Sequence, residues 1–301
     1  MPIFSKSWWL DSVCGSNNWD VALVEQDDKI IASLPYFVVT KAMIKMIVMP
    51  QFTQTMGPYI IYPADQKYDK KLSYEKTIMS ELIKSLPKVH KFSQNFHPSI
   101  ENWLPFYWHD YEQTTRYSYV IEDLSNLEKV SSGFSRAKRR NIKRAEKIVE
   151  VKYDLPVDEF YKNHSLTLKK QNKKIDYEFD LLEQMYTAAY LNQSGATIYA
   201  IDEANNIHAA LFIIWDQNSA YDLISTIDPD FRDSGAATLL VREAIRHVAG
   251  RTTKFDFEGS MVENVEASFR QFGAIQKQYF RISKINSQLL QMKKIMSLIL
   301  R

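Results

Sequence analysis

The chain has 301 residues, a formal net charge of +2 and 45% hydrophobic residues, which suits a folded protein of two domains of about 150 residues each. This charge excludes DNA binding through the overall field, so an anionic ligand needs a local basic patch. The single cysteine, Cys14, excludes an intrachain disulfide framework, and no apolar run reaches the length of a membrane span. Because the first residues also lack a signal-peptide pattern, we expect a cytoplasmic protein.

In the first half, apolar runs and polar turns predict two helices and several strands. A helix at residues 7–14 comes first, and a hairpin that turns at Asp27-Asp28 follows it. A second helix ends before Pro87. We expect this helix at 73–85, the hairpin strands at 21–25 and 30–39, and further strands at 44–49, 58–62, 91–95 and 114–120.

The second half predicts helices and strands in an order typical of a mixed α/β sheet with helices on its faces. We expect helices at 132–149, 157–170, 178–192, 235–249 and 262–272, and strands at 197–202, 207–216, 219–227, 253–258 and 274–283. A last helix at 287–300 carries an apolar stripe, which predicts docking onto the protein body or contact with a membrane surface or a second copy. The stripe consists of Leu289, Met292, Met296 and Ile299.

A turn between a predicted strand and a predicted helix combines small residues with an arginine. It reads Arg232-Asp233-Ser234-Gly235-Ala236-Ala237. Amides at a helix N-terminus bind phosphate, and small side chains let the phosphate approach the backbone. A tight turn with only a structural role has the same composition. The candidate anion-binding residues are Arg232, Ser234, Gly235, Ala236 and Ala237.

The strand that follows this helix carries two carboxylates. In Phe255-Asp256-Phe257-Glu258, alternation places both phenylalanines on the core face and both acids on the other face. Acyl transfer to an amine or hydroxyl needs a base that accepts a proton. We expect Glu258 to be this base, with Asp256 as the alternative base or as the group that binds the amine. Structural ion pairs with helix residues are the competing explanation.

The predicted helix at 132–149 is strongly basic. Arg136, Arg140, Lys143 and Lys147 share one face at spacings of four and three residues. Such a face is either simply solvated or binds a polyanion, such as a nucleotide-sugar diphosphate, a tRNA backbone or an anionic membrane. We take Arg136, Arg140 and Lys143 as candidate substrate-binding residues. The opposite, apolar stripe is expected to contain Phe134, Ala137, Ala145 and Ile148.

Residues 131–283 resemble the FemAB-like branch of the GNAT acyltransferase superfamily, which includes the methicillin-resistance proteins. The spacing Arg232-x-x-Gly235-x-Ala237 resembles the superfamily's acyl-CoA motif. The segment Phe255-Asp256-Phe257-Glu258-Gly259-Ser260 and the helix end Phe269-Arg270-Gln271-Phe272-Gly273 resemble the narrower branch. The resemblance implies an α/β (α+β) protein of two GNAT-like domains, each a mixed, mostly antiparallel sheet flanked by helices. We expect a degenerate domain at 1–125, an acyltransferase domain at 126–285 and a C-terminal helix at 286–301.

The function implied by this resemblance is transfer of an acyl group from acyl-CoA to an amine or hydroxyl of a cell-envelope or small-molecule acceptor. Acyl-CoA would be a co-substrate at the glycine turn, with no tightly bound cofactor, and the acceptor would be anionic and nucleotide-sugar-like. One alternative is an aminoacyl-tRNA-dependent transferase that acts on a peptidoglycan precursor. Another is a scaffold without catalysis. We expect no metal site, because the six histidines lack metal-binding spacings.

Overall fold

The computed structural model describes residues 1–259 and 261–299, without the side chains of 293–295 and 297–299. The chain forms two compact units, and each is described by itself. Unit 1 comprises Met1–Arg116 and Gln278–Arg301, and unit 2 comprises Tyr117–Lys277. The chain therefore leaves unit 1 once and returns to it, and the residues after 285 fold with the first unit.

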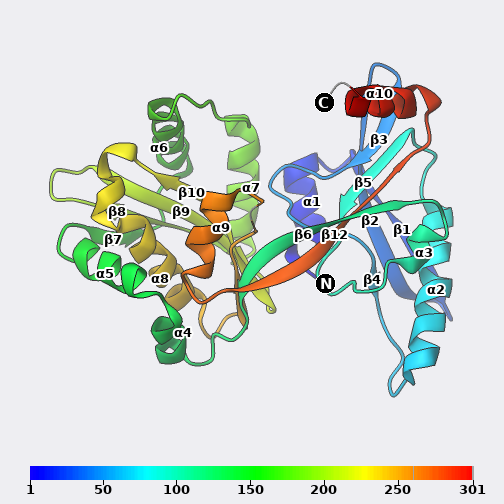
Figure 1. Cartoon of the computed structure of the whole chain (residues 1–301), viewed down its shortest axis with the longest axis horizontal. Coiled ribbons are helices and arrows are strands. Elements are labelled where there is room, and N and C mark those ends of the chain that lie inside the picture. The colour runs from blue at the N-terminus through cyan, green and yellow to red at the C-terminus, as the bar shows by residue number, and fades with distance from the viewer. Residues whose placement is uncertain (260, 300–301) are drawn as a thin grey trace. The chain divides into compact units, whose positions relative to one another are not determined.

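Unit 1 contains one sheet and the helices that pack on it (Figure 1). The hairpin predicted at Asp27-Asp28 is confirmed, and both residues have positive φ, at 51° and 60°. The elements are η1 (Ile3–Ser5), α1 (Ser7–Cys14), β1 (Trp19–Gln26), β2 (Lys29–Lys41), β3 (Ile44–Val48), β4 (Tyr59–Ile60), α2 (Tyr68–Ser85), β5 (Lys91–Asn95), α3 (Leu104–Tyr107), β6 (Glu112–Ile121), β12 (Ile275–Ile285) and α10 (Gln288–Ile299). Chain entry into unit 2 occurs within β6, and the return occurs within β12.

The sheet of unit 1 runs in the order β1-β2-β3-β5-β12, and β4 pairs with β2. Strands β3 and β5 are parallel, whereas the pairs β1–β2, β2–β3 and β5–β12 are antiparallel. Helix α2 packs against β1 and β2 through a buried stripe of Ile78, Met79 and Leu82. The stripe matches helical spacing, which explains why this helix is readable from the sequence. The predicted start at residue 73 is wrong, because the helix begins at Tyr68.

Unit 2 is a sheet in the order β6-β11-β10-β9-β8-β7. Only the pair β10–β11 is parallel among the pairs β6–β11, β11–β10, β10–β9, β9–β8 and β8–β7. The elements are α4 (Leu127–Gly133), α5 (Arg136–Ala145), β7 (Glu150–Tyr153), α6 (Val157–Lys170), α7 (Phe179–Leu191), β8 (Gly195–Ile201), β9 (Ile207–Trp215), β10 (Ser219–Ile227), η2 (Pro229–Ser234), α8 (Ala236–Val248), β11 (Lys254–Asp256) and α9 (Glu263–Arg270).

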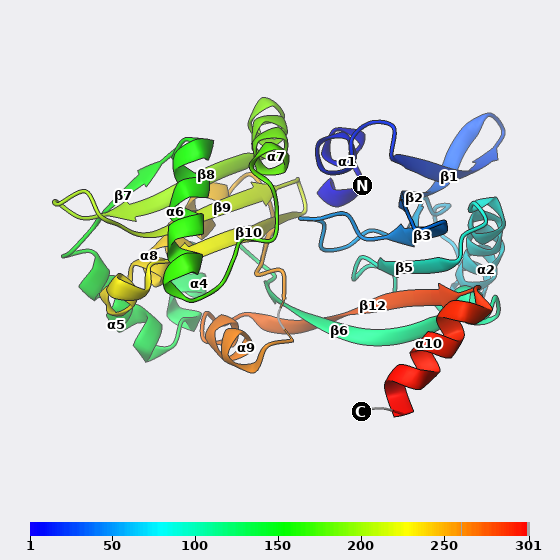
Figure 2. The same cartoon turned by 90° about the horizontal axis from the view of Figure 1, so that it is seen from above.

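Helices cover both faces of the sheet of unit 2 (Figures 1 and 2). On β9, Leu211 and Ile213 join the core that contains α8, whereas Phe212 packs against Phe160 of α6 and Tyr186 of α7. Eight of the nine β9 residues are consequently buried. A strand with both faces covered loses the polar alternation of a half-exposed strand. The predicted mixed α/β architecture is confirmed.

The single basic helix predicted at residues 132–149 is wrong. The chain instead forms α4 and α5, separated at Phe134-Ser135, and residues from Glu150 onward form β7. Ser135 starts the second helix because its hydroxyl accepts a hydrogen bond from the Lys138 amide at 3.2 Å, which is an N-cap. Lys147 therefore lies beyond the helix that carries the other basic residues.

The described part of the apolar stripe on the C-terminal helix α10 is largely exposed, which contradicts docking onto the protein body, one of the three roles predicted for it. Leu289, Met292 and Met296 are each 54% exposed. The Ile299 side chain and residue Leu300 lie outside the described residues. No helix in the described part of the chain has the length and apolar character needed to cross a membrane.

Candidate active site

Strands β10 and β11 run side by side for only three residue pairs and then part. Ser219 to Tyr221 pair with Lys254 to Asp256, and the β10 partners on its other side shift register between Asp222 and Ile224. A bulge of this kind bends a strand and redirects its side chains. Asp222 is the first β10 residue past the parallel pairing, and Asp256 is the last residue of β11. Carboxylates from both strands therefore meet where the strands separate.

Three carboxyl groups form this cluster, and their charges are poorly hydrated. Asp222 is 8% exposed and Asp256 is 6% exposed. Burial raises the pKa of Asp222 to about 6, against a small opposing effect of the hydrogen bond from Ser225. Burial, followed by the charges of Asp256 and Asp222, raises the pKa of Glu258 well above its usual value. The cluster thus places Asp222, whose pKa is about 6, beside a Glu258 whose surroundings favour the protonated carboxyl.

Asp256 fixes the turn that carries Glu258. Its Oδ1 accepts a hydrogen bond from the Glu258 amide at 2.8 Å and another from the Ser118 hydroxyl. A carboxylate that accepts from an amide two residues on stabilises a tight turn. Asp256 therefore holds both the strand end and the backbone of its neighbour.

Glu258 sits in a backbone conformation that few side chains adopt. Its φ is 58°, in the left-handed region, and such a residue costs of order 1 kcal/mol or more. The next residue, Gly259, has φ 68°, and a Cβ there would lie 2.2 Å from the Tyr117 carbonyl oxygen. Glu258 Oε1 is buried without a hydrogen-bond partner among the described atoms. Strain and an unpaired buried oxygen at one position are typical of a residue kept for function.

The structure bears out the alternation predicted for Phe255 to Glu258 only in part. Phe255 and Phe257 are buried in the core of unit 2. Asp256 and Glu258 do approach each other, but through a turn, since β11 ends at Asp256. Asp222, the third member, was assigned no role from the sequence. The available signal was that Asp222 is the single charged residue of this strand.

The predicted anion-binding turn lies at the N-terminus of α8. Gly235 has φ 84°, and a Cβ on it would lie 2.4 Å from the Asn141 carbonyl oxygen of α5. This glycine is thus required by the contact between two helices. Ser234 Oγ accepts from the Ala236 amide at 3.2 Å, Ala236 is buried and Ala237 is partly buried. Arg232 is exposed. The 13 residues of α8 direct a positive helix end at this turn.

The basic face of α5 is exposed, as predicted, at Arg136, Arg140 and Lys143. Among the described residues, none of the three forms an ion pair with an acidic side chain. The expected apolar stripe is wrong at two positions, because Ala137 and Ile148 are exposed. The buried stripe is formed by Lys138, Ile142 and Ala145.

Two other basic groups have structural partners. Lys170 forms ion pairs with Asp228 at 2.6 Å and with Asp230 at 2.7 Å. His208 is 2% exposed, its ring stacks on Phe231 at 4.0 Å between ring centres, and its Nε2 lies 3.1 Å from Asp202 Oδ2. Within residues 1–259 and 261–299, no group of three or more His, Cys, Asp or Glu has metal-site geometry.

Part of unit 2 is similar in sequence to a known protein family. Residues 132–262 match the family described as acetyltransferase (GNAT) domain. Unit 2 carries a GNAT domain. The matched range of this GNAT domain contains α5, the glycine turn and all three carboxylates. No curated protein sequence matches the chain.

Solved structures extend the likeness of fold beyond the GNAT domain. A crystal structure of FemX superposes with a TM-score of 0.68 at 10% identity, covering 92% of this chain and 91% of that chain. L-PGS from Bacillus licheniformis has a TM-score of 0.55 at 12% identity, with coverages of 97% and 92%. A tandem GNAT protein from the clavulanic acid biosynthesis pathway has a TM-score of 0.51 at 9% identity, covering 89% and 83%. The predicted FemAB-like GNAT fold and its transferase-type domain are confirmed.

Proposed function

We propose that this protein is an acyltransferase that moves an acyl group from acyl-CoA to an amine or hydroxyl of a cell-envelope or small-molecule acceptor. The observation that carries the proposal is the cluster of the buried Asp222 and Asp256 with the half-buried Glu258 where β10 and β11 part. Carboxyl groups whose pKa values differ through their surroundings supply both an acid and a base at neutral pH. The cluster lies in a domain of the acetyltransferase type.

In the proposed mechanism, the acceptor amine attacks the thioester carbonyl carbon, a C–N bond forms and the C–S bond breaks. Asp222 accepts the proton of the amine, because its pKa of about 6 leaves it mostly ionised at pH 7. Glu258 gives its proton to the departing thiolate, which leaves as the CoA thiol. Asp256 positions the Glu258 turn. This assignment differs from the expectation that Glu258 is the base, because burial and the neighbouring carboxylates raise its pKa and so favour the role of proton donor.

The donor side of the proposed site is the turn from Arg232 to Ala237. Exposed Arg232 and the positive end of α8 suit the phosphates of CoA. A substitution of Gly235 does not test donor binding separately from folding, since any side chain there meets the Asn141 backbone. A substitution of Arg232 does, because Arg232 is exposed.

An aminoacyl-tRNA donor with a peptidoglycan-precursor acceptor is the second candidate. It is favoured by the exposed cationic face of Arg136, Arg140 and Lys143 and by the likeness of fold to FemX. Phosphate backbones bind such faces. On this proposal the same carboxylates act on an ester carbonyl in place of a thioester, and the protein works in the cytoplasm, with peripheral membrane contact where the acceptor is lipid-linked.

The test of the activity measures thiol release from acetyl-CoA with glucosamine, spermidine and lysine as acceptors. We expect release with the wild type and a loss of at least about 100-fold in Glu258→Gln and Asp222→Asn, the size typical of a general acid or base. Asp158→Asn, at an exposed aspartate of α6 outside the proposed site, is the matched control, and it should keep full activity. Wild-type rates in both cluster variants would refute the mechanism.

The test of the donor measures thermal stabilisation by CoA and retention on immobilised total tRNA. Acyl-CoA use predicts stabilisation that Arg232→Glu abolishes. Retention on tRNA that Arg140→Glu abolishes, without a response to CoA, would replace the first candidate by the second. A chain that responds to neither ligand and releases no thiol would be a scaffold without catalysis.

A further inference from the structure

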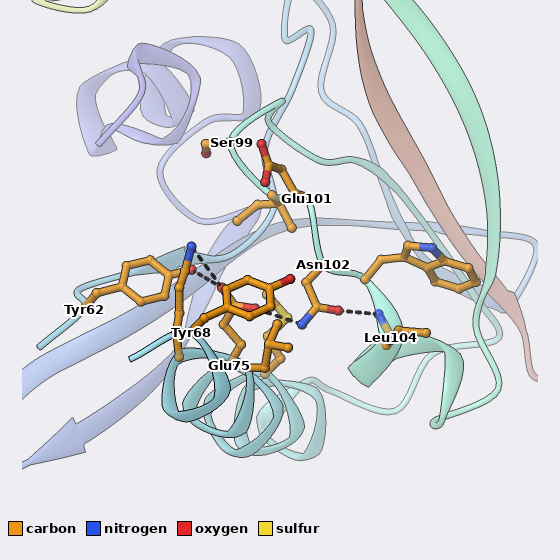
Figure 3. A pocket seen from close by; sticks show the side chains of 12 residues that line it. Tyr62, Tyr68, Glu75, Ser99, Glu101, Asn102 and Leu104 are labelled. Carbon is orange, nitrogen blue, oxygen red and sulfur yellow. Dashed lines mark hydrogen bonds and ion pairs between the residues drawn. The ribbon is translucent and has the colours of Figure 1, made fainter. Parts of the chain in front are cut away.

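Unit 1 contains a pocket of about 350 Å³ that the proposed reaction does not use. Residues of α2 form one side of it, and the segments at Tyr62 and at 99–104 form the rest (Figure 3). This volume falls in the range of small-molecule sites. All of its lining residues belong to unit 1, whereas the carboxylate cluster belongs to unit 2.

A buried carboxylate lies at the base of this pocket and is held by fixed partners. Glu75 is 5% exposed. Its Oε1 accepts from the Tyr62 hydroxyl at 2.9 Å, and its Oε2 accepts from Asn102 Nδ2 at 2.8 Å. The Asn102 carbonyl in turn accepts from the Leu104 amide at 3.2 Å. A carboxylate has about four acceptor positions, so each Glu75 oxygen retains capacity for a further donor.

Aromatic rings surround this polar group. Tyr62, Tyr68 and Trp103 all line the pocket, and Tyr68 is 75% exposed (Figure 3). The core of unit 1 does not require such an exposed ring. Tyrosine offers a flat apolar face together with a polar edge, which suits ligands that are both apolar and hydroxylated.

The charges of the pocket select among ligand classes. The lining contains the cation Lys71 and two anions, Glu75 and Glu101, so an anionic nucleotide finds no excess positive charge. The ammonium group of Lys71 already occupies the position that a ligand ammonium group would take, because Lys71 Nζ lies 5.0 Å from the Tyr62 ring centre and 3.8 Å from Glu75 Oε1. A neutral polyol avoids both conflicts.

We propose that this pocket binds a neutral carbohydrate ring. The apolar face of the sugar stacks on Tyr68, while its hydroxyl groups donate to Glu75 and interact with Asn102. Lys71 donates to the ring or hydroxyl oxygens. The inference stands apart from the proposed acyl transfer, because sugar binding and thiol release are measured separately.

The test is calorimetric titration of the full chain with cellobiose and with N,N′-diacetylchitobiose, up to roughly 10 mM. We expect saturable binding of at least one disaccharide. Tyr68→Ala should weaken it about tenfold or more, and folding should survive because this side chain is exposed. Trp108→Ala is the matched control, since Trp108 is an exposed aromatic residue of unit 1 outside the pocket lining, and it should bind as the wild type does.

Three results would overturn the proposal. The first is the absence of binding by either disaccharide. The second is equal binding by the wild type and Tyr68→Ala, which places the sugar elsewhere. The third is binding of n-butylammonium or uridine monophosphate that Glu75→Gln or Tyr68→Ala abolishes, without sugar binding, which assigns the pocket to a cation or an anion.

Discussion

At the scale of single residues, the cluster shows why charge states depend on position. Asp222 and Asp233 are equally acidic in sequence, yet only Asp222 lies buried beside other carboxyl groups. The alternation of side chains along β10 can be predicted from the sequence. The β11 residues beside Asp222 cannot be, because they come from a segment more than thirty residues away. The resulting pKa is a property of the assembled site.

Replacement of Asp222 by asparagine should stabilise the fold while it impairs transfer. The folded-state pKa of about 6 exceeds the unfolded value of 3.8, so the wild type loses stability as pH rises from about 4 through 6. Asp222→Asn removes this loss, which amounts to roughly 3 kcal/mol at most. Denaturant unfolding at pH 4 and pH 7.5 measures it.

The expected pattern for Asp222→Asn is equality with the wild type at pH 4 and a higher midpoint at pH 7.5. Asp233→Asn should match the wild type at both pH values, because Asp233 is exposed. A variant less stable than the wild type at pH 7.5 would contradict this prediction. It would show that the charged Asp222 raises the free energy of unfolding, whereas we expect it to lower it.

At the scale of elements, α5 shows how a helix presents one charge set and buries another. Lys138 is on the face opposite Arg136, Arg140 and Lys143, and it is 9% exposed. Its Nζ donates to Ser268 Oγ at 2.8 Å and lies 4.1 Å from the centre of the Phe272 ring. Burial lowers the pKa of Lys138 to about 8. Helix α5 therefore packs against α9 and the residue Phe272 that follows it through the ammonium group of Lys138.

This buried lysine predicts an unusual stability profile at alkaline pH. Between about pH 8 and 10.5 the unfolded chain binds the Lys138 proton more tightly than the folded protein does, so wild-type stability rises over this range. Lys138→Met should be more stable than the wild type at pH 7 and should lack this rise. Urea midpoints at pH 7, 8.5 and 10 measure both.

Lys143→Met serves as the matched control for this profile, because Lys143 lies on the exposed face of the same helix. It should keep the wild-type rise. If Lys138→Met destabilises the protein at pH 7, the Phe272 contact and the Ser268 hydrogen bond outweigh the cost of burying the charge.

At the scale of the whole molecule, the chain closes unit 1 with its own C-terminal part. Strand β12 pairs with β5 from Arg281 to Ile285, and Ile282 is fully buried in the core of unit 1. The fold of unit 1 thus depends on residues that follow the whole of unit 2. Contacts this distant in sequence leave no local pattern.

Deletion of residues 278–301 should therefore unfold unit 1 and spare unit 2. The loss exposes the β5 edge and removes Ile282 from the core. Hydrogen exchange should show protection lost in β1, β2 and α2 and retained in β8, β9 and α8. Deletion of residues 288–301 alone removes only α10 and should leave both units protected. Loss of protection in β8 and β9, with β1 and β2 unaffected, would contradict the assignment.

The sequence by itself determined the order and type of most elements, because alternation and helical spacing are local. Strand 219–227 and helix 157–170 were predicted with the bounds that the structure has. Only the tertiary structure decided that Asp222 joins Asp256 and Glu258, that Lys138 points inward and that β12 completes unit 1. These outcomes depend on which strands pair and which faces are covered, and long-range contacts set both.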